Sequence, residues 1–161
     1  MEISNDEFVF EPAPDHPGWH TWNLADPSRF NAQTMGNLVA REESLPGGNA
    51  AVRLRFHPER RHSNLAGAVH GGVTLALIDI SLFAALHILG NGDAGRSVTL
   101  DLSTQFIGAG QIGQPLDAVT EVLRETGRLV FLRGIVEQPV AGEGPATIAA
   151  FNATIRKPSR K

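Results

Sequence analysis

The sequence predicts an α+β domain in which an antiparallel sheet curls around one long helix. The helix is expected where about twenty residues, HGGVTLALIDISLFAALHILG, form an apolar run of helical length. Two runs with the period-two pattern of strands precede it, and about four more follow it. This order, with strands on both sides of a single helix, is typical of an α+β fold.

The first two strands are expected to form a hairpin around residues 46–48, Pro-Gly-Gly. MGNLVAREES precedes this turn and NAAVRLRF follows it. In the second run Val52, Leu54 and Phe56 alternate with arginines, which predicts one buried face.

The long helix is apolar around nearly its whole circumference. The side chains that cover these directions are Leu75, Leu77, Ile78, Ile80, Leu82, Phe83, Leu86 and Ile88. A helix without a polar face must be enclosed. We therefore expect the sheet to cover part of it and a second copy of the chain to cover the rest.

Downstream of the helix and the turn-like NGDAG, four consecutive strands are expected. The alternation in SVTLDLSTQFI predicts a strand with Val98, Leu100 and Leu102 on one face and Thr99, Asp101 and Ser103 on the other. LDAVTEVLRE and GRLVFLRGIVEQ are joined near residues 126–127, and PATIAAFNATIRK follows the loop VAGEG.

Residues 1–30 are predicted to be an N-terminal extension of the domain formed by residues 31–161. Prolines and acidic residues indicate an irregular chain that Trp19 and Trp22 are expected to dock. The segment DPSRFNAQTM starts with the Asp-Pro pair typical of a helix start, so a short helix is predicted there. We expect the extension to pack on the exterior of the sheet. The alternative is a cap over a ligand tunnel or an oligomer surface.

The composition excludes several classes of function. The chain has no cysteine, which excludes disulfides, thiolate nucleophiles and cysteine-ligated zinc, and we expect no metal or other cofactor. A net charge of −3 and scattered arginines argue against a nucleic-acid partner. The N-terminus lacks the pattern of a secretory signal, and polar residues interrupt the apolar stretch at residues 69–89. We therefore expect a cytoplasmic protein without a membrane span.

Asp79 is the first candidate for a catalytic residue, because it lies in the middle of the apolar helix. Its neighbours at three- and four-residue spacings are mostly apolar. Burying a carboxylate there without partners would cost several kcal/mol. The alternative is a structural aspartate held by hydroxyl groups such as those of Thr74 or Ser81.

His70, Gly71 and Gly72 open the same helix, where the first N–H groups lack partners inside the helix and the dipole favours negative charge. Two glycines admit close approach of a ligand. A thioester carbonyl, whose oxygen becomes negative when water adds, suits such donors. The alternative is a tight turn from strand to helix with no further role.

The spacing Asn-x5-His-Gly-Gly-x6-Asp, from Asn64 to Asp79, resembles the PaaI-type acyl-CoA thioesterases of the hotdog superfamily. The string NLAGAVHGGVTLALIDISLFAAL is similar to that family at nearly every position, and the strand order agrees from about Met35 to Lys157. The resemblance implies a hotdog fold, hydrolysis of an acyl- or aryl-acyl-CoA thioester, and a homodimer or a dimer of dimers. It also implies that Asn64 lies near the reacting carbonyl or water.

The resemblance implies roles for four further residues. Asp79 matches the carboxylate that acts as general base on water or as nucleophile. The Gly71 N–H matches the donor that polarises the thioester carbonyl, and His70 helps to shape its loop. Thr99 matches a Ser or Thr that holds the attacking water in many relatives, with Ser97 as the alternative alignment.

The helix geometry predicts that active sites are shared between subunits. The nine residues from Gly71 to Asp79 span roughly 13 Å along the axis, so one chain cannot bring both ends to one carbonyl. Two antiparallel helices across a two-fold axis would bring Gly71 of one subunit beside Asp79 of the other.

Coenzyme A contacts are expected from basic residues near the surface. The candidates are Arg124, Arg128, Arg156 and Lys157, together with Gly72 at the helix start. Two other functions stay open: a non-catalytic acyl-CoA-binding or sensing domain, and a hotdog enoyl-CoA hydratase. The presence of Asp79 argues against the first, and the lack of a His-rich dehydratase pattern against the second.

Overall fold

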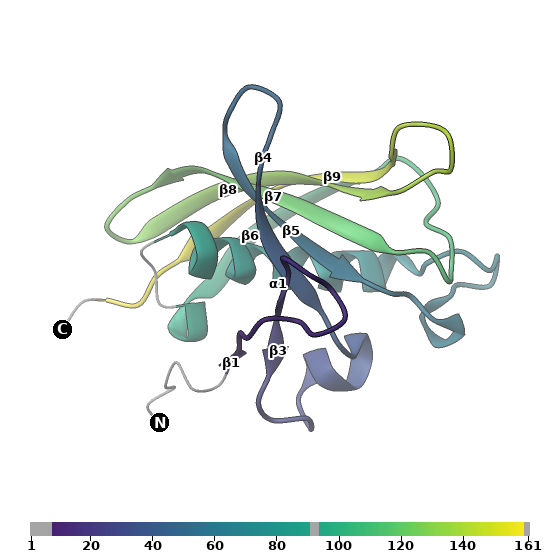
Figure 1. Cartoon of the computed structure of the whole chain (residues 1–161). Coiled ribbons are helices and arrows are strands. Elements are labelled where there is room, and N and C mark those ends of the chain that lie inside the picture. The colour runs from purple at the N-terminus through teal and green to yellow at the C-terminus, as the bar shows by residue number, and fades with distance from the viewer. Residues whose placement is uncertain (1–7, 91–93, 160–161) are drawn as a thin grey trace.

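A computed structural model describes residues 8–90 and 94–159. In it, a seven-stranded sheet lies across one long helix (Figure 1). The sheet order is β2-β4-β5-β7-β8-β9-β6, and all neighbouring strands are antiparallel. The strands are β2 (His20–Thr21), β4 (Val39–Ser44), β5 (Ala50–Phe56), β6 (Val98–Phe106), β7 (Leu116–Glu125), β8 (Leu129–Gln138) and β9 (Ala146–Arg156).

The helix α1 (Gly71–Leu89) packs against the inner face of this sheet. The inner side chains of β5 that the alternation predicted, Val52, Leu54 and Phe56, are all 0 % exposed and join the core with α1. An antiparallel sheet wrapped around one central helix is the hotdog fold, so the predicted fold class is confirmed.

Outside the N-terminal extension, the predicted strands match the observed ones closely. The hairpin before the helix is β4–β5, and the four strands after it are β6 to β9. Of the predicted NGDAG turn, residues 91–93 lie outside the described residues, while the last two begin the short 3-10 helix η4 (Ala94–Arg96).

A β-bulge in β6 makes the predicted alternation of that strand wrong. Thr99 and Asp101 lie opposite consecutive residues of β9, which leaves Leu100 as the extra residue. A bulge switches every side chain beyond it to the other face of the sheet from the one that simple alternation predicts. Thr99 therefore faces α1 on one side of the bulge and Leu102 packs against the core on the other, although the alternation placed them on opposite faces.

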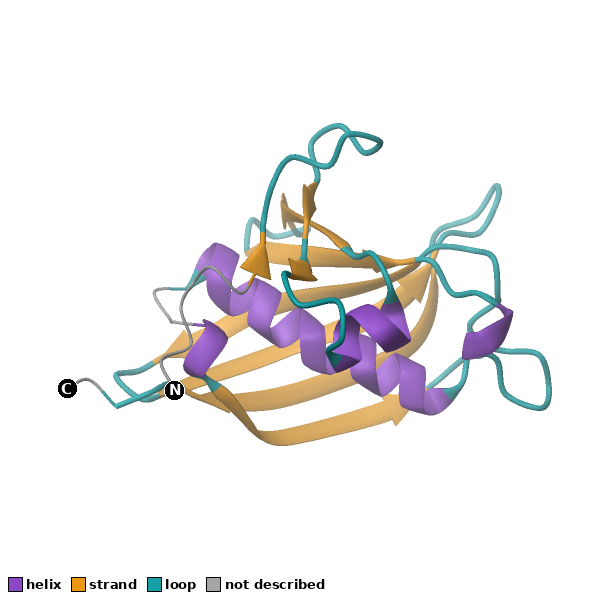
Figure 2. Ribbon diagram, turned by 90° about the horizontal axis from the view of Figure 1, so that it is seen from below, coloured by secondary structure: helices purple, strands orange, loops and turns teal. Residues whose placement is uncertain are grey.

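The N-terminal extension runs along one flank of α1 (Figure 2). Within it β1 (Phe8–Val9) pairs with β3 (Asn23–Leu24). Trp22 is 2 % exposed and belongs to the main core. Its ring stacks on Phe8 at 4.7 Å between centroids and lies 5.2 Å from the ring of His87, near the end of α1. For Trp22, the expectation that the extension packs on the exterior of the sheet is wrong.

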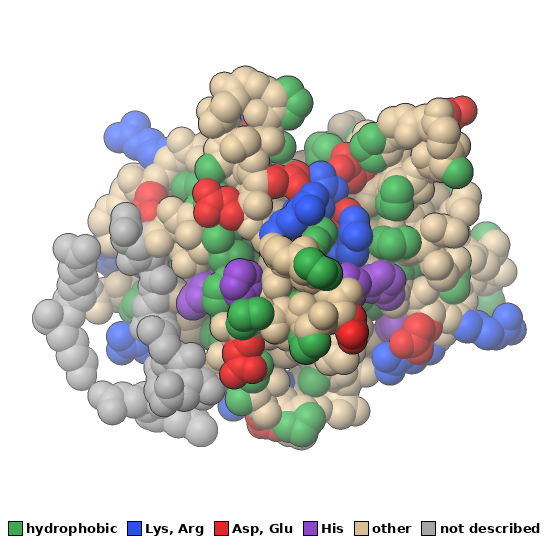
Figure 3. Space-filling model, viewed as in Figure 1, with side chains coloured by type: hydrophobic (Ala, Val, Ile, Leu, Met, Phe, Trp, Pro, Cys, Tyr) green, Lys and Arg blue, Asp and Glu red, His purple; other side chains and the backbone are tan. Residues whose placement is uncertain are grey.

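Trp19 does pack on the outer face of the sheet. The guanidinium groups of Arg41 and Arg55 lie over its ring at 4.5 and 4.8 Å from the centroid. Arg55 also forms a two-pronged ion pair with the buried Asp117, at 2.8 and 2.7 Å. Figure 3 shows basic and acidic side chains gathered together on this face.

A hydrogen-bonded network around Arg53 continues this outer-face cluster. Arg53 donates hydrogen bonds to Glu43, Asp117 and Glu137 at 2.7 to 2.9 Å. The bond from Arg53 lowers the pKa of Glu43 below its usual range, although partial burial opposes the shift. Because every member of this network is paired, we assign it to structure.

The predicted short helix begins later than expected. The Asp26 carboxylate accepts hydrogen bonds from the Ser28 amide at 2.9 Å and the Ser28 hydroxyl at 2.6 Å. Such a side-chain turn competes with helix formation. Only one helical turn follows, η2 (Asn31–Met35), so the first half of the predicted helix is wrong.

One flank of α1 and the adjoining edge of the sheet stay uncovered in the single chain. α1 has the length and apolar composition of a membrane-crossing helix, yet here the sheet and the extension bury much of it. On the open flank Leu75 is 38 % exposed. Beside it, the edge strand β6 exposes Val98, Leu100 and Phe106 by 43, 52 and 52 %. The open flank and this edge form one continuous surface, because β6 contacts α1 at both ends of the strand.

Candidate active site

Asp79 lies on the open flank of α1, within hydrogen-bond distance of the edge strand. Its Oδ1 accepts a hydrogen bond of 2.7 Å from the Thr99 hydroxyl. The carboxylate is half-buried, whereas its apolar neighbours in sequence led us to expect enclosure. The Ser81 hydroxyl instead donates to the Ile78 carbonyl at 2.7 Å, on the buried side of the helix. Among the described residues, neither Thr74 nor Ser81 holds Asp79.

The bulge in β6 explains how a polar side chain reaches this position. The register shift at Leu100 lets Thr99 point toward Asp79 while Leu102 still packs in the core. Ser97, the alternative to Thr99 in the sequence alignment, precedes the strand and is buried. The geometry therefore favours Thr99 as the partner of Asp79.

The start of α1 presents one unused N–H group. The His70 side chain caps the helix, and its Nδ1 accepts a 2.9 Å hydrogen bond from the Gly72 amide. The Gly72 N–H is thus occupied and is not available as a donor to a substrate in this structure. The Gly71 N–H has no hydrogen-bond partner within the described part of the chain. His70 therefore occupies the N–H of Gly72 and leaves the N–H of Gly71 available.

The backbone does not require glycine at residue 71. Its φ is not positive, and a Cβ would meet only the Phe106 ring, at the ordinary contact distance of 3.5 Å. The missing side chain leaves the N–H open to close approach, which suits a ligand. Gly72 differs, because a Cβ there would lie 3.1 Å from the capping His70 Nδ1. Glycine at 72 therefore allows the His70 ring to fold over the helix start.

Asn64 shapes the loop that leads into the helix. Its Oδ1 accepts hydrogen bonds from the Ala66 amide at 2.9 Å and the Ala68 amide at 3.1 Å. The backbone N–H of Asn64 also donates to the Ala68 carbonyl at 2.8 Å. The side-chain oxygen is therefore used within the loop, and only its NH2 group could serve a substrate.

A single chain does not bring the unused N–H to the carboxylate. Gly71 and Asp79 are eight residues apart in α1, so their levels differ by about 12 Å along the axis. Each group therefore lacks a counterpart within its own chain.

Three of the four basic residues that we predicted to bind coenzyme A line one surface groove of about 220 Å³. These are Arg128, Arg156 and Lys157, and the structure adds Arg96 to them. Arg96 was not predicted as a coenzyme A contact, because a single basic residue between the helix and the next strand forms no recognisable pattern. Val98 also lines the groove, and it precedes Thr99, the partner of Asp79, by one residue along β6.

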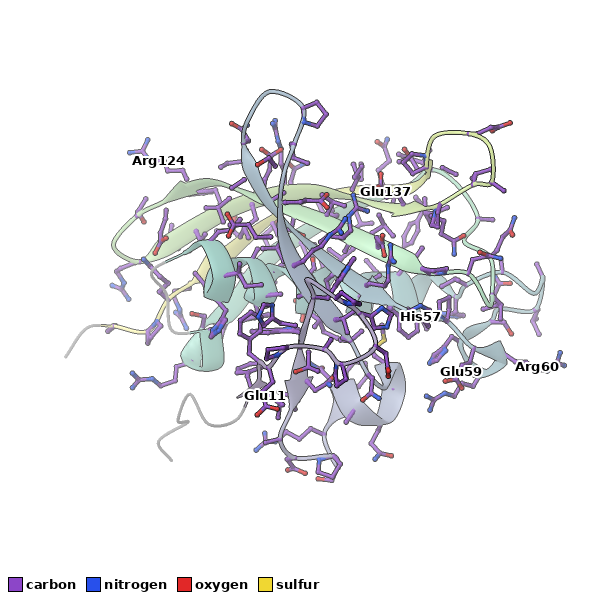
Figure 4. All side chains as sticks on the ribbon, viewed as in Figure 1. Glu11, His57, Glu59, Arg60, Arg124 and Glu137 are labelled. Carbon is purple, nitrogen blue, oxygen red and sulfur yellow. The ribbon has the colours of Figure 1, made fainter. Side chains whose placement is uncertain are left out.

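Two of the predicted coenzyme A contacts, Arg124 and Lys157, are less well placed to bind an anion. Arg124 does not line the groove, and Figure 4 shows it pointing into solvent from one end of the sheet. Lys157 is tied to Glu125 by an ion pair of 2.5 Å, which reduces its freedom to meet a phosphate. Arg96, Arg128 and Arg156 are the other basic residues that line the groove.

One protein-family model matches just under half of the chain. Residues 66–143, which include α1 and β6, match the family model of the Thioesterase superfamily. No curated protein matches the chain at a significant level.

Solved structures share the fold at low sequence identity. Zebra fish thioesterase superfamily member 2 is 22 % identical with a TM-score of 0.58, over 74 % of this chain and 81 % of its own. The E. coli PaaI protein from the phenylacetic acid degradation operon is 15 % identical with a TM-score of 0.61, over 82 % and 86 %. The Pseudomonas aeruginosa protein PA5202 is 24 % identical with a TM-score of 0.55, over 73 % and 87 %. Likeness at these identities shows the fold alone.

Proposed function

Because residues 66–143 match the family model of the Thioesterase superfamily, we propose that the chain hydrolyses an acyl-CoA thioester to the free acid and coenzyme A. The observation that carries this proposal is the Asp79–Thr99 pair on the open flank of α1. A half-exposed carboxylate with one oxygen held by a hydroxyl leaves its other oxygen to take a proton from water.

In the proposed reaction, Asp79 removes a proton from water as the water oxygen attacks the thioester carbonyl. The Gly71 N–H of a second subunit donates to the carbonyl oxygen and stabilises its developing negative charge. The tetrahedral intermediate then expels the coenzyme A thiolate. The proton held by Asp79 returns to the products, and the free acid and thiol leave.

The proposed active unit is a homodimer with two shared sites. The exposed apolar edge of β6 is a surface that another strand can cover by main-chain pairing. The open flank of α1 adjoins it, so one partner would cover both surfaces. In a two-fold dimer with antiparallel helices, each Asp79 would face the Gly71 of the other chain.

We assign the groove of Arg96, Arg128 and Arg156 to the phosphates of coenzyme A. Single alanine substitutions there are expected to raise KM more than they lower kcat, because phosphate contacts are equal in ground and transition states. Steady-state kinetics at two salt concentrations measure this, and the wild-type KM should rise with salt. Arg124→Ala, outside the groove, is the matched control. Unchanged KM in all three groove variants would move the coenzyme A site to another face.

Release of free thiol from a panel of acyl-CoA thioesters tests the proposed function. We expect thiol release that continues over many turnovers. A hydratase would consume an enoyl-CoA without releasing thiol, and a binding domain would retain the ligand unchanged. Either of these outcomes would reject the thioesterase assignment.

A further inference from the structure

Phe106 ends β6 directly beside the unused N–H group of Gly71. Two carbons of its ring lie 3.5 Å from the position that a Cβ on Gly71 would occupy. Its side chain is 52 % exposed. The aromatic ring therefore lies beside the residue whose N–H is unused.

The contact distances limit where a bound carbonyl group can lie. An oxygen that accepts a hydrogen bond from the Gly71 N–H lies about 2.9 Å from the nitrogen. The carbonyl carbon is one bond farther, so its substituents lie close enough to Gly71 for the neighbouring Phe106 ring to contact them at about 4 Å. Leu75, four residues along α1 and 38 % exposed, extends the apolar border by one helical turn.

The strand pairing expected in the dimer brings Phe106 to the other half of the site. Within one chain Phe106 and Thr99 are seven residues apart on β6, so roughly 23 Å separate them. Two antiparallel copies of β6 related by a two-fold axis near the strand centre would place the end of one beside the beginning of the other. Phe106 of one chain then lies next to Thr99 and Asp79 of its partner.

We propose that Phe106 is the specificity-determining residue of this site and that it selects apolar acyl groups. Its ring forms the wall against which the acyl group packs while Gly71 holds the carbonyl oxygen. This inference rests on the proposed thioesterase function. It predicts that the wild type hydrolyses hexanoyl- and phenylacetyl-CoA with higher kcat/KM than acetyl- or succinyl-CoA, because the wall is apolar and large enough to contact more than a methyl group.

The test compares kcat/KM of wild type and Phe106→Ala on these four thioesters. Loss of the wall is expected to lower the hexanoyl-to-acetyl and phenylacetyl-to-acetyl ratios by at least about tenfold, the range for removing a hydrophobic pocket contact. Phe106→Leu keeps an apolar strand end and should reduce mainly the phenylacetyl ratio. Ile107→Ala, at the next and similarly exposed position, is the matched control and should leave all ratios unchanged.

Different outcomes overturn different claims. An equal loss on all four thioesters, or an equal change of the ratios in Ile107→Ala, would reject the role of Phe106 in acyl selection. So would a wild-type preference for acetyl- or succinyl-CoA. Absence of thiol release by the wild type on the whole panel would instead reject the proposed function.

Discussion

Asp79→Asn is expected to lower kcat at least about a hundredfold, the low end for losing a general base. The amide preserves the shape of the side chain, and its oxygen can still accept the hydrogen bond that Thr99 donates to Asp79 Oδ1. The substitution therefore removes the proton acceptor and leaves the local geometry in place. Steady-state turnover on the best substrate measures the loss, and coenzyme A binding, measured by calorimetry, should persist.

Asp101→Asn is the matched control for this substitution. Asp101 lies on the same edge strand, is exposed, and sits just beyond the bulge. Its variant should keep turnover near that of the wild type. If Asp79→Asn retains more than a tenth of wild-type turnover, Asp79 is a structural residue and the proposed chemistry is wrong.

Mixing Gly71→Pro subunits with Asp79→Asn subunits is expected to restore activity that neither variant has alone. Gly71 is the first residue of α1, a position where proline fits because its N–H has no partner inside the helix. His70 has φ −65° and ψ 137°, the extended conformation that a residue before proline requires. The substitution thus removes the N–H donor with little change to the fold. Loss of one such donor typically costs a hundredfold or more in kcat.

The expected recovery follows from symmetry. Random exchange makes half of the dimers mixed, and each mixed dimer has one intact site and one site with both lesions, so activity should approach about a quarter of wild type. The two variants measured separately are the controls, because neither homodimer has an intact site. Exchange confirmed by mass spectrometry without recovery would show that Gly71 and Asp79 do not meet across an interface.

The sequence by itself predicted the long helix, the strands outside the extension and, together with the family resemblance, the catalytic candidates. The apolar run that opens at His-Gly-Gly predicted α1, and the alternation of Val52, Leu54 and Phe56 predicted the buried face of β5. Helical rise alone separated Gly71 from Asp79 and called for a second subunit. These conclusions depend on local periodicity and on spacing within one element, which the order of residues records directly.

The tertiary structure decided which groups are available to a ligand. Gly71 and Gly72 look equivalent in the sequence, but the His70 ring occupies the N–H of one and leaves the other unused. The groove joins Arg96, Arg128 and Arg156 from three separate segments, which only the closing of the sheet brings together.

The facing of β6 and the docking of the extension likewise depended on tertiary contacts. No glycine or proline marks the bulge at Leu100. Simple alternation therefore extends across it and assigns Leu102 and Thr99 to opposite faces of the sheet. Trp22 packs near the end of α1, beside His87, because the sheet does not cover this part of the apolar helix. Both results come from long-range packing against α1, and for that reason period and composition did not reveal them.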